Sequence, residues 1–398
     1  MNRTAEGADI VLLIKGQSQY DTMRELTADI AVAFRQRGLQ VVEIDGMAPG
    51  AGALLEALMS GGRVAFVYGM NGWGLGASLN LNRLCDDAGV PYVGHLFDHP
   101  LTYAKRLFDA PRNAVWCLHD STYVRFVDED LALPGAKAVV PVGGPVADPA
   151  ATPLPVDARD IAILFPGSGY SSTTATKPWS TASAAERKVM DAIYDLALYD
   201  TGRPLHDTIR QVLRLYSGVA VDWRADWIAR IFTMLDNQLR VERRVEVVKA
   251  LAELPIQVYG HGWDNLAAKG GGARFHAPVG FRETQALMGR AKVVLNVLPC
   301  VVDAPHDRIF YSTMAGAVSL TDRNRWVERH YAEGGELAIY DLPPRDLGAA
   351  VAEFLADRDS LERIAAAGRA RTAEDHTWLN RVDAILDAVA AQRLAYAA

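Results

Sequence analysis

The stretch LNVLPCVVDAPHDRIFYSTMAGAVSLTD, residues 295–322, contains the elements that decide the fold. Both of its ends are apolar, which predicts two buried strands. Between them, a polar loop at 299–307 leads through Arg308 into a segment with the pattern of a helix. Because a strand, a helix and a second strand in this order are typical of a parallel sheet, the stretch predicts an α/β domain.

The same alternation extends over most of the chain. Apolar runs separated by segments of helix length lie at 9–15, 40–45, 63–69, 91–97, 114–120 and 136–143. A second series opens within 160–172 and continues at 256–260, 292–298, 317–322 and 336–341. Uninterrupted apolar runs are expected of strands that are covered on both faces by helices. The sequence therefore predicts two Rossmann-like α/β domains.

The domain boundaries follow from length and composition. The chain has 398 residues, more than one hydrophobic core usually supports. A segment dense in Pro, Gly and Asp, 143–160, has the composition of a linker. We expect an N-terminal domain at 1–148 and a C-terminal domain at 149–378, facing each other across a cleft. The second domain carries a helical insertion at about 174–245, and a closing helix at 379–398 can cross back onto the first domain.

Composition excludes several classes of protein. The formal net charge of −7 argues against a bulk attraction to nucleic acid or anionic lipid. The three cysteines, Cys85, Cys117 and Cys300, lack the spacing of a zinc site or a disulfide framework. No apolar run is long enough for a signal peptide or a membrane span. We therefore expect a cytoplasmic protein without a transmembrane segment or a nucleic-acid partner, and a homo-oligomer stays open.

In parallel sheets, ligand-binding residues follow the carboxyl ends of the strands. The loop PGSGYSS, 166–172, follows the first strand of the second domain. Gly167 and Gly169 would let a phosphate approach the backbone, and Ser168 could add a hydroxyl. The alternative is a flexible turn before an inserted helix. The dinucleotide fingerprint G-x-G-x-x-G is absent, since Ser172 stands at the third glycine position.

Two loops of the first domain hold polar and aromatic candidates. YGMNGWGLG, 68–76, places Asn71 and Trp73 after a strand, where Trp73 could stack on a sugar or an aglycone. The alternative is a surface turn that carries an aromatic residue. LFDHPL, 96–101, places Asp98 and His99 after the next strand, where either could take a proton from a hydroxyl. The alternative is that Asp98 caps a helix with Pro100 in its first turn.

The position of Arg308 calls for a reason, because a cation at a helix N-terminus opposes the helix dipole. A bound anion would supply one, since the guanidinium and the helix amides could converge on it. The alternative is an ion pair with Asp303 or Asp307. No metal-binding pattern stands out, so any diphosphate chemistry should rely on Arg, Lys and helix N-termini.

The C-terminal third resembles a known family. The matching segments, which span about 256–386, are VYGHGWD (258–264), VGFRETQALMGRAKVVLNVLP (279–299), HDRIFYSTMAGAVSLTD (306–322), YAEGGELAIYD (331–341) and AAAGRARTAEDHTWLNRVDAIL (365–386). Their order and spacing resemble the CgeB-like (spore maturation protein) glycosyltransferases of the two-domain GT-B superfamily. DIAILFPGSG, 160–169, is similar to the opening of the same domain, and LFDHP is a looser match in the first domain.

The resemblance implies that the second domain holds a nucleoside diphosphate sugar. It assigns the following residues to that donor: Gly167, Ser168 and Gly169 with Arg308 at the phosphates, Tyr259, Gly260 and Trp263 near the base, and Arg282, Asn296, His306, Asp307 and Tyr311 around them. The chain departs from the family at Tyr311, where an acidic residue credited with holding the ribose is usual. Another ribose contact, another donor or a loss of transfer activity would each explain this departure.

The resemblance implies a glycosyltransferase that uses no metal or cofactor. The acceptor, a glycan, a small molecule, a lipid or a protein, would bind the first domain near Asn71 and Trp73. Asp98 or His99 would be the catalytic base if the reaction inverts the anomeric centre. The alternatives are a nucleotide-sugar epimerase on the same architecture and a non-catalytic module that binds a sugar nucleotide or a partner. A dehydrogenase is the third and weakest alternative, because the dinucleotide-binding fingerprint G-x-G-x-x-G is missing.

Overall fold

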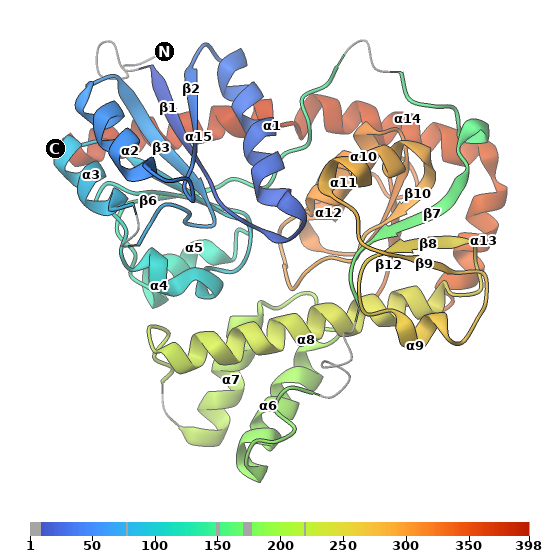
Figure 1. The fold of residues 1–398 in the computed structure, drawn as a ribbon. Helices are drawn as coiled ribbons and strands as arrows, with labels where there is room; N and C mark the ends of the chain where they lie inside the picture. The colour runs from blue at the N-terminus through green and yellow to red at the C-terminus, as the bar shows by residue number, and fades with distance from the viewer. Residues whose placement is uncertain (1–8, 77–78, 149–151, 170–176, 219, 398) are drawn as a thin grey trace. The chain divides into compact units, whose positions relative to one another are not determined.

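The computed structural model describes residues 9–76, 79–148, 152–169, 177–218 and 220–397. The chain divides into two compact units, unit 1 with residues 1–146 and 376–398, and unit 2 with residues 147–375. Within the described residues each unit contains one six-stranded sheet, and all strand pairs in both sheets are parallel. The predicted α/β fold is therefore confirmed (Figure 1).

The sheet of unit 1 has the strand order β2-β1-β3-β4-β5-β6. Its central strand β3 is buried over its whole length, as its uninterrupted apolar sequence predicts. The strands are β1 (Ile10–Lys15), β2 (Gln40–Asp45), β3 (Val64–Met70), β4 (Tyr92–Leu96), β5 (Val115–Leu118) and β6 (Ala136–Val139). The α-helices of this unit are α1 (Thr22–Gln36), α2 (Ala51–Ser60), α3 (Leu81–Ala88), α4 (Ala104–Leu107), α5 (Tyr123–Arg125) and α15 (Trp378–Ala397).

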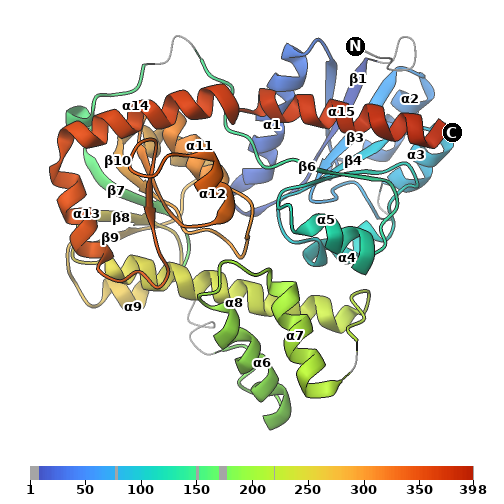
Figure 2. The same ribbon diagram turned by 180° about the vertical axis from the view of Figure 1, so that it is seen from behind.

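Helix α15 completes unit 1 from the far end of the sequence. It packs against α1, β5 and β6, and Figure 2 shows it running across this unit. At its start Trp378 is fully buried, with its ring edge-on to His95 and Phe97. A Cβ on Gly143 would lie 2.9 Å from Trp378 atoms, so only glycine fits there. The last helix is therefore part of the core of unit 1.

The sheet of unit 2 has the order β12-β11-β10-β7-β8-β9. Its strands are β7 (Ile161–Pro166), β8 (Ile256–Tyr259), β9 (Arg274–His276), β10 (Ala291–Leu295), β11 (Val318–Asp322) and β12 (Ala338–Tyr340). The helices around it are α9 (Asp264–Ala267), α10 (Phe281–Arg290), α11 (Asp307–Met314), α12 (Arg325–His330), α13 (Leu347–Ala356) and α14 (Arg358–Asp375). The stretch 295–322 thus forms the end of β10, a loop, α11 and β11, as its pattern predicts.

A helical segment separates β7 from β8. It consists of α6 (Ala184–Ala197), α7 (Leu205–Ser217) and the long α8 (Asp226–Ala250). Ser183 and Glu186 form a capping box that fixes the start of α6. Figures 1 and 2 both show α6 and α7 beside α8. Residues 170–176, which include part of the predicted glycine loop and the predicted start of the insertion, lie outside the described residues.

Candidate functional site

The glycine loop after β7 is held against the loop after β8. The amide of Gly167 donates to the carbonyl of Tyr259, and that of Gly169 donates to the carbonyl of His261, each at 2.9 Å. A Cβ on Gly260 would lie 2.3 Å from the carbonyl oxygen of Gly167. The amides of both glycines, which were predicted to bind a phosphate, are thus used within the protein.

Trp263 supports this loop. Its indole Nε1 donates to the carbonyl of Gly167 at 2.9 Å, and its ring is in contact with Gly169. Only 3% of Trp263 is exposed, and its ring stacks on Phe275. Tyr259 is only partly buried, and its ring stacks on His276 at 4.4 Å between centroids. Tyr259 and Trp263 were both predicted to lie near the nucleobase of the donor. Of the two, Tyr259 therefore has the more accessible side chain.

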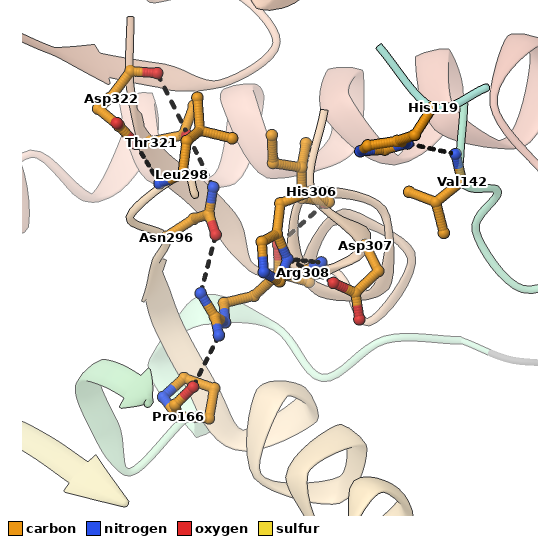
Figure 3. A network of polar contacts seen from close by, with 12 residues as sticks. His119, Val142, Pro166, Asn296, Leu298, His306, Asp307, Arg308, Thr321 and Asp322 are labelled. Atoms are coloured by element: carbon orange, nitrogen blue, oxygen red, sulfur yellow. Dashed lines mark hydrogen bonds and ion pairs between the residues drawn. The ribbon is translucent and has the colours of Figure 1, made fainter. Parts of the chain in front are cut away.

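Arg308 lies at the start of α11 and points into unit 2. Its Nη1 donates to Asn296 Oδ1 at 2.8 Å and its Nη2 to the carbonyl of Pro166 at 2.8 Å (Figure 3). Its guanidinium also lies 5.5 Å from the ring centroid of Phe165. Burial lowers the pKa of this guanidinium, which is only 8% exposed, and the nearby Asp307 opposes that shift. Arg308 thus brings a charge to the end of β7.

Asn296 and Asp322 form the polar base of this arrangement (Figure 3). Asn296 is fully buried, and its Nδ2 donates to Thr321 Oγ1 at 2.9 Å. Asp322 Oδ1 accepts from the amide of Leu298 at 2.7 Å. Burial raises the pKa of Asp322 to about 6, although the Leu298 amide opposes this shift. A carboxyl group that changes charge near neutral pH therefore lies at the end of β11.

The loop before α11 places His306 and Asp307 beside Arg308. His306 is the N-cap residue, and its Nδ1 accepts from the amide of Arg308 at 3.1 Å. Burial lowers the pKa of His306, and the adjacent Asp307 opposes this shift. Burial raises the pKa of Asp307, but His306 and Arg308 together outweigh that effect and lower the pKa to about 2. The predicted neighbours of Arg308 thus form one connected group.

A second arginine, Arg244 on α8, joins this group and was not predicted from the sequence. Its Nη1 lies 3.5 Å from the carbonyl oxygen of Ser168, two residues along the loop from the Arg308 contact. Burial, together with the neighbouring charges of Arg308 and Arg240, lowers its pKa to about 10. Arg244 and Arg308, called the arginine pair below, thus present two like charges at one loop.

Two other predicted donor residues lie differently. Tyr311 is only 3% exposed and meets Phe281 edge-on, with ring centroids 5.1 Å apart. Arg282 is exposed on α10 and donates to Gln285 Oε1 at 3.2 Å.

Unit 1 has a separate polar group at the ends of β3 and β4. Asn71, buried and in the left-handed conformation (φ 50°), donates through Nδ2 to Asp98 Oδ2 at 3.2 Å and to the Tyr103 hydroxyl at 3.0 Å. Tyr103 in turn donates to Asp98 Oδ2 at 2.8 Å. Arg106 donates through Nη1 to the Asn71 carbonyl at 3.2 Å. These four residues are called the Asn71 cluster below.

His99, next to this cluster, has a structural role. Its Nδ1 accepts from the amide of Leu101 at 3.3 Å and caps the short 3₁₀ helix Pro100–Tyr103. The ring is 4% exposed and packs against Tyr123 and Phe126. A residue of this loop therefore caps the next helical turn, as the alternative interpretation predicts. The capping residue is His99, however, and not Asp98. Asp98 is left facing the polar side chains.

Among the described residues, no group of three or more His, Cys, Asp or Glu side chains is arranged to hold a metal ion. The same part of the chain contains no helix with the length and apolar character needed to cross a bilayer.

Several solved structures share this architecture. An alpha-glucosyltransferase, solved with UDP and a DNA 13-mer that contains an HMU base, is 8% identical with a TM-score of 0.55, over 96% of this chain and 100% of that chain. The sucrose-phosphate synthase of Thermosynechococcus elongatus is 11% identical with a TM-score of 0.52, over 98% of this chain and 100% of that one. AviGT4, a glycosyltransferase involved in avilamycin A biosynthesis, is 13% identical with a TM-score of 0.50, over 97% and 98%. At these identities the similarity shows the fold alone.

The sequence comparison gives a family match for one part of the chain. Residues 240–387 match the family model described as "Glycosyl transferase-like". The match covers less than half of the chain. The matched region begins within α8 and includes both members of the arginine pair. No match was found among curated proteins.

Proposed function

We propose that this protein is a glycosyltransferase of the CgeB-like group, which transfers a sugar from a nucleoside diphosphate sugar to a hydroxyl acceptor. Unit 2 binds the donor through the arginine pair, and unit 1 binds the acceptor at the Asn71 cluster. The observation that carries the proposal is the approach of Arg244 and Arg308 to the same loop, within the region that matches the family. The similar alpha-glucosyltransferase was solved with UDP, which supports a nucleoside diphosphate.

The arginine pair suits a diphosphate for an electrostatic reason. Two guanidinium groups beside each other repel, and the lowered pKa of Arg244 reflects this repulsion as well as burial. With a pKa of about 10, Arg244 stays charged at neutral pH. A diphosphate would neutralise both cations and accept several hydrogen bonds from their planar N–H groups. The same two charges would stabilise the departing diphosphate during transfer, without a metal ion or a cofactor.

On the acceptor side, Asp98 is the residue that can engage a hydroxyl. Tyr103 and Asn71 both donate to its Oδ2, so the orientation of the carboxylate is set before the acceptor binds. In an inverting reaction Asp98 would take the proton of the attacking hydroxyl. In a retaining reaction it would only hold that hydroxyl in place.

The test begins with the donor. A thermal-shift screen against UDP, GDP, ADP and dTDP identifies the base, since a bound ligand raises the melting temperature. Calorimetry then compares Arg244→Gln with Arg230→Gln, a matched control because Arg230 is exposed on the same helix. We expect Arg244→Gln to weaken diphosphate binding by at least about tenfold, about 1.4 kcal/mol, and the control to leave it unchanged.

Two further outcomes sharpen the test. The corresponding uncharged nucleoside should bind both variants equally, because it lacks the phosphates that Arg244 contacts. Equal diphosphate affinity in wild type and Arg244→Gln would overturn the assignment of the arginine pair. Incubation with the sugar nucleotide alone separates transfer from epimerisation, since only an epimerase would isomerise the donor without an acceptor.

A further inference from the structure

Arg106 is the one member of the Asn71 cluster that carries a positive charge. Other arginines of unit 1 form ion pairs, among them Arg24 with Asp45, Arg35 with Glu43 and Arg37 with Asp383. The partly buried guanidinium of Arg106 forms no ion pair with any carboxylate of the described residues. Its described partners are the Asn71 carbonyl oxygen and the rings of Trp73 and Tyr103, whose centroids lie 5.1 and 5.2 Å away.

The surrounding residues fix this guanidinium in place. Trp73 fits closely over Gly16, where an added Cβ would lie 2.1 Å from the indole ring. The stem of Arg106 packs on the turn after β3, where a Cβ on Gly72 would lie 3.0 Å from Arg106 Cδ. An arginine held between two aromatic rings has already lost much of its side-chain freedom, so a bound ligand does not have to supply that ordering.

The hydrogen-bonding capacity of this group exceeds its described use. A guanidinium has five N–H donors in a plane, and the Asn71 carbonyl accepts from Nη1. Carboxylates and phosphates match that geometry and prefer arginine over lysine. A rigid, partly buried cation of this kind, with no carboxylate of the described residues paired to it, is suited to an anionic ligand.

Asn71 connects this cation to the proposed acceptor residue. Its side-chain amide donates to Asp98, while its carbonyl accepts from Arg106. One residue thus joins a carboxylate suited to a hydroxyl and a guanidinium suited to an anion. A ligand that used both would carry a hydroxyl and an anionic group close together.

We propose that Arg106 binds a carboxylate or phosphate group of the acceptor, and that the acceptor is therefore a small anionic molecule with a hydroxyl near that group. This inference rests on the proposed function, because it assigns the Asn71 cluster to the acceptor.

Three probes with one carbon skeleton test the proposal: glycerol, glycerate and glycerol 3-phosphate. The side-chain Nε–H signal of Arg106 is followed by NMR during titration of the full chain, with Arg106→Lys used to assign the signal. We expect millimolar glycerate or glycerol 3-phosphate to shift it and glycerol to leave it in place. The charged probe that binds more tightly distinguishes a carboxylate from a phosphate. No shift with either charged probe would overturn the proposal.

Calorimetry with two variants separates recognition from a structural role. Arg106→Gln should weaken binding of the preferred charged probe by at least about tenfold and leave the nucleoside diphosphate affinity unchanged. Arg112→Gln is the matched control, since Arg112 is exposed and paired with Asp86. Weaker nucleoside diphosphate binding in Arg106→Gln would show that this residue serves the donor, which contradicts the proposal. If wild type binds no nucleoside diphosphate, the proposed function fails instead.

Discussion

The arginine pair of unit 2 and the Asn71 cluster of unit 1 hold charged groups in two different ways. Arg308 is 8% exposed and rests on Asn296, which is fully buried. In the Asn71 cluster, Asn71 is buried, whereas Asp98 and Arg106 are only partly so. Unit 2 thus buries a charged side chain, Arg308, whereas in unit 1 the charged side chains are partly exposed and are joined by one buried asparagine.

Burial determines how a substitution in each region should act. A charged or polar group inside a core affects folding as well as binding, because removing its partner leaves an unsatisfied group. A partly exposed group can be changed with less effect on folding, since water can replace its lost hydrogen bonds. We therefore expect activity and stability to separate in unit 1 and to change together in unit 2.

The largest effect is expected for Asp98→Asn in unit 1. The asparagine keeps an oxygen for Tyr103 and Asn71 but loses the negative charge. If Asp98 is the base, kcat should fall by about 100-fold or more, with a stability change below about 1 kcal/mol. If Asp98 only orients the hydroxyl, the loss should be nearer tenfold. Steady-state kinetics and the anomeric configuration of the product, read by NMR, distinguish these cases.

His99→Ala is the companion variant for this prediction. Because His99 caps a helical turn from a buried position, its removal should lower stability by about 1–2 kcal/mol and leave kcat within a few-fold of wild type. An inactive His99→Ala that folds normally, beside an active Asp98→Asn, would reverse the roles assigned to these two residues.

A smaller effect, on stability, is expected for Asp322→Asn in unit 2. The folded-state pKa of Asp322, about 6, lies above the ordinary value of 3.8, so the folded protein holds a proton that the unfolded chain releases. This contribution to stability is complete below about pH 4 and is lost as pH rises through about 6. The variant should not show this loss. Its free energy of unfolding, minus that of wild type, should therefore be about 2–3 kcal/mol larger at pH 8 than at pH 4. Urea unfolding of both proteins from pH 4 to 8 measures this difference. Parallel curves of stability against pH for the two proteins would contradict the prediction.

A loss of similar or smaller size is expected for Gly260→Ala in unit 2. The new methyl group would meet the backbone of Gly167, which cannot move without disturbing the glycine loop. We expect a loss of about 1–3 kcal/mol in stability together with weaker nucleoside diphosphate binding. Gly289→Ala in α10 is the control, because a Cβ there has nothing within 4 Å and alanine favours a helix. Equal behaviour of the two variants would show that this loop tolerates displacement.

Much of the fold could be predicted from the sequence, because strands covered on both faces are continuous apolar runs. Strand β9, Arg274–His276, was not predicted, since three residues with two polar side chains give no such run. The glycine loop and Arg308 were found because they directly follow β7 and precede α11. Arg244 was missed because it lies within a long helix, where an arginine normally marks the solvent face.

Side-chain contacts that form only in the folded chain were the least predictable part of the candidate sites. Trp263 was expected near a nucleobase, but its indole bonds to the glycine loop, which no local pattern shows. The cap role of His99 was assigned to Asp98 because acidic residues are the commoner caps. Arg106 gave no signal at all, since its significance depends on Trp73, Tyr103 and Asn71 meeting it in the folded chain.

The return of α15 to unit 1 has a consequence for biosynthesis. Because unit 1 takes its last helix from residues that follow all of unit 2, a ribosome must synthesise 147–375 before that helix exists. Until then the surfaces that Trp378 later covers, beside His95 and Phe97, remain open to solvent. The first unit to emerge is thus the last to be completed, and a chain that stops near residue 375 would leave it unfinished.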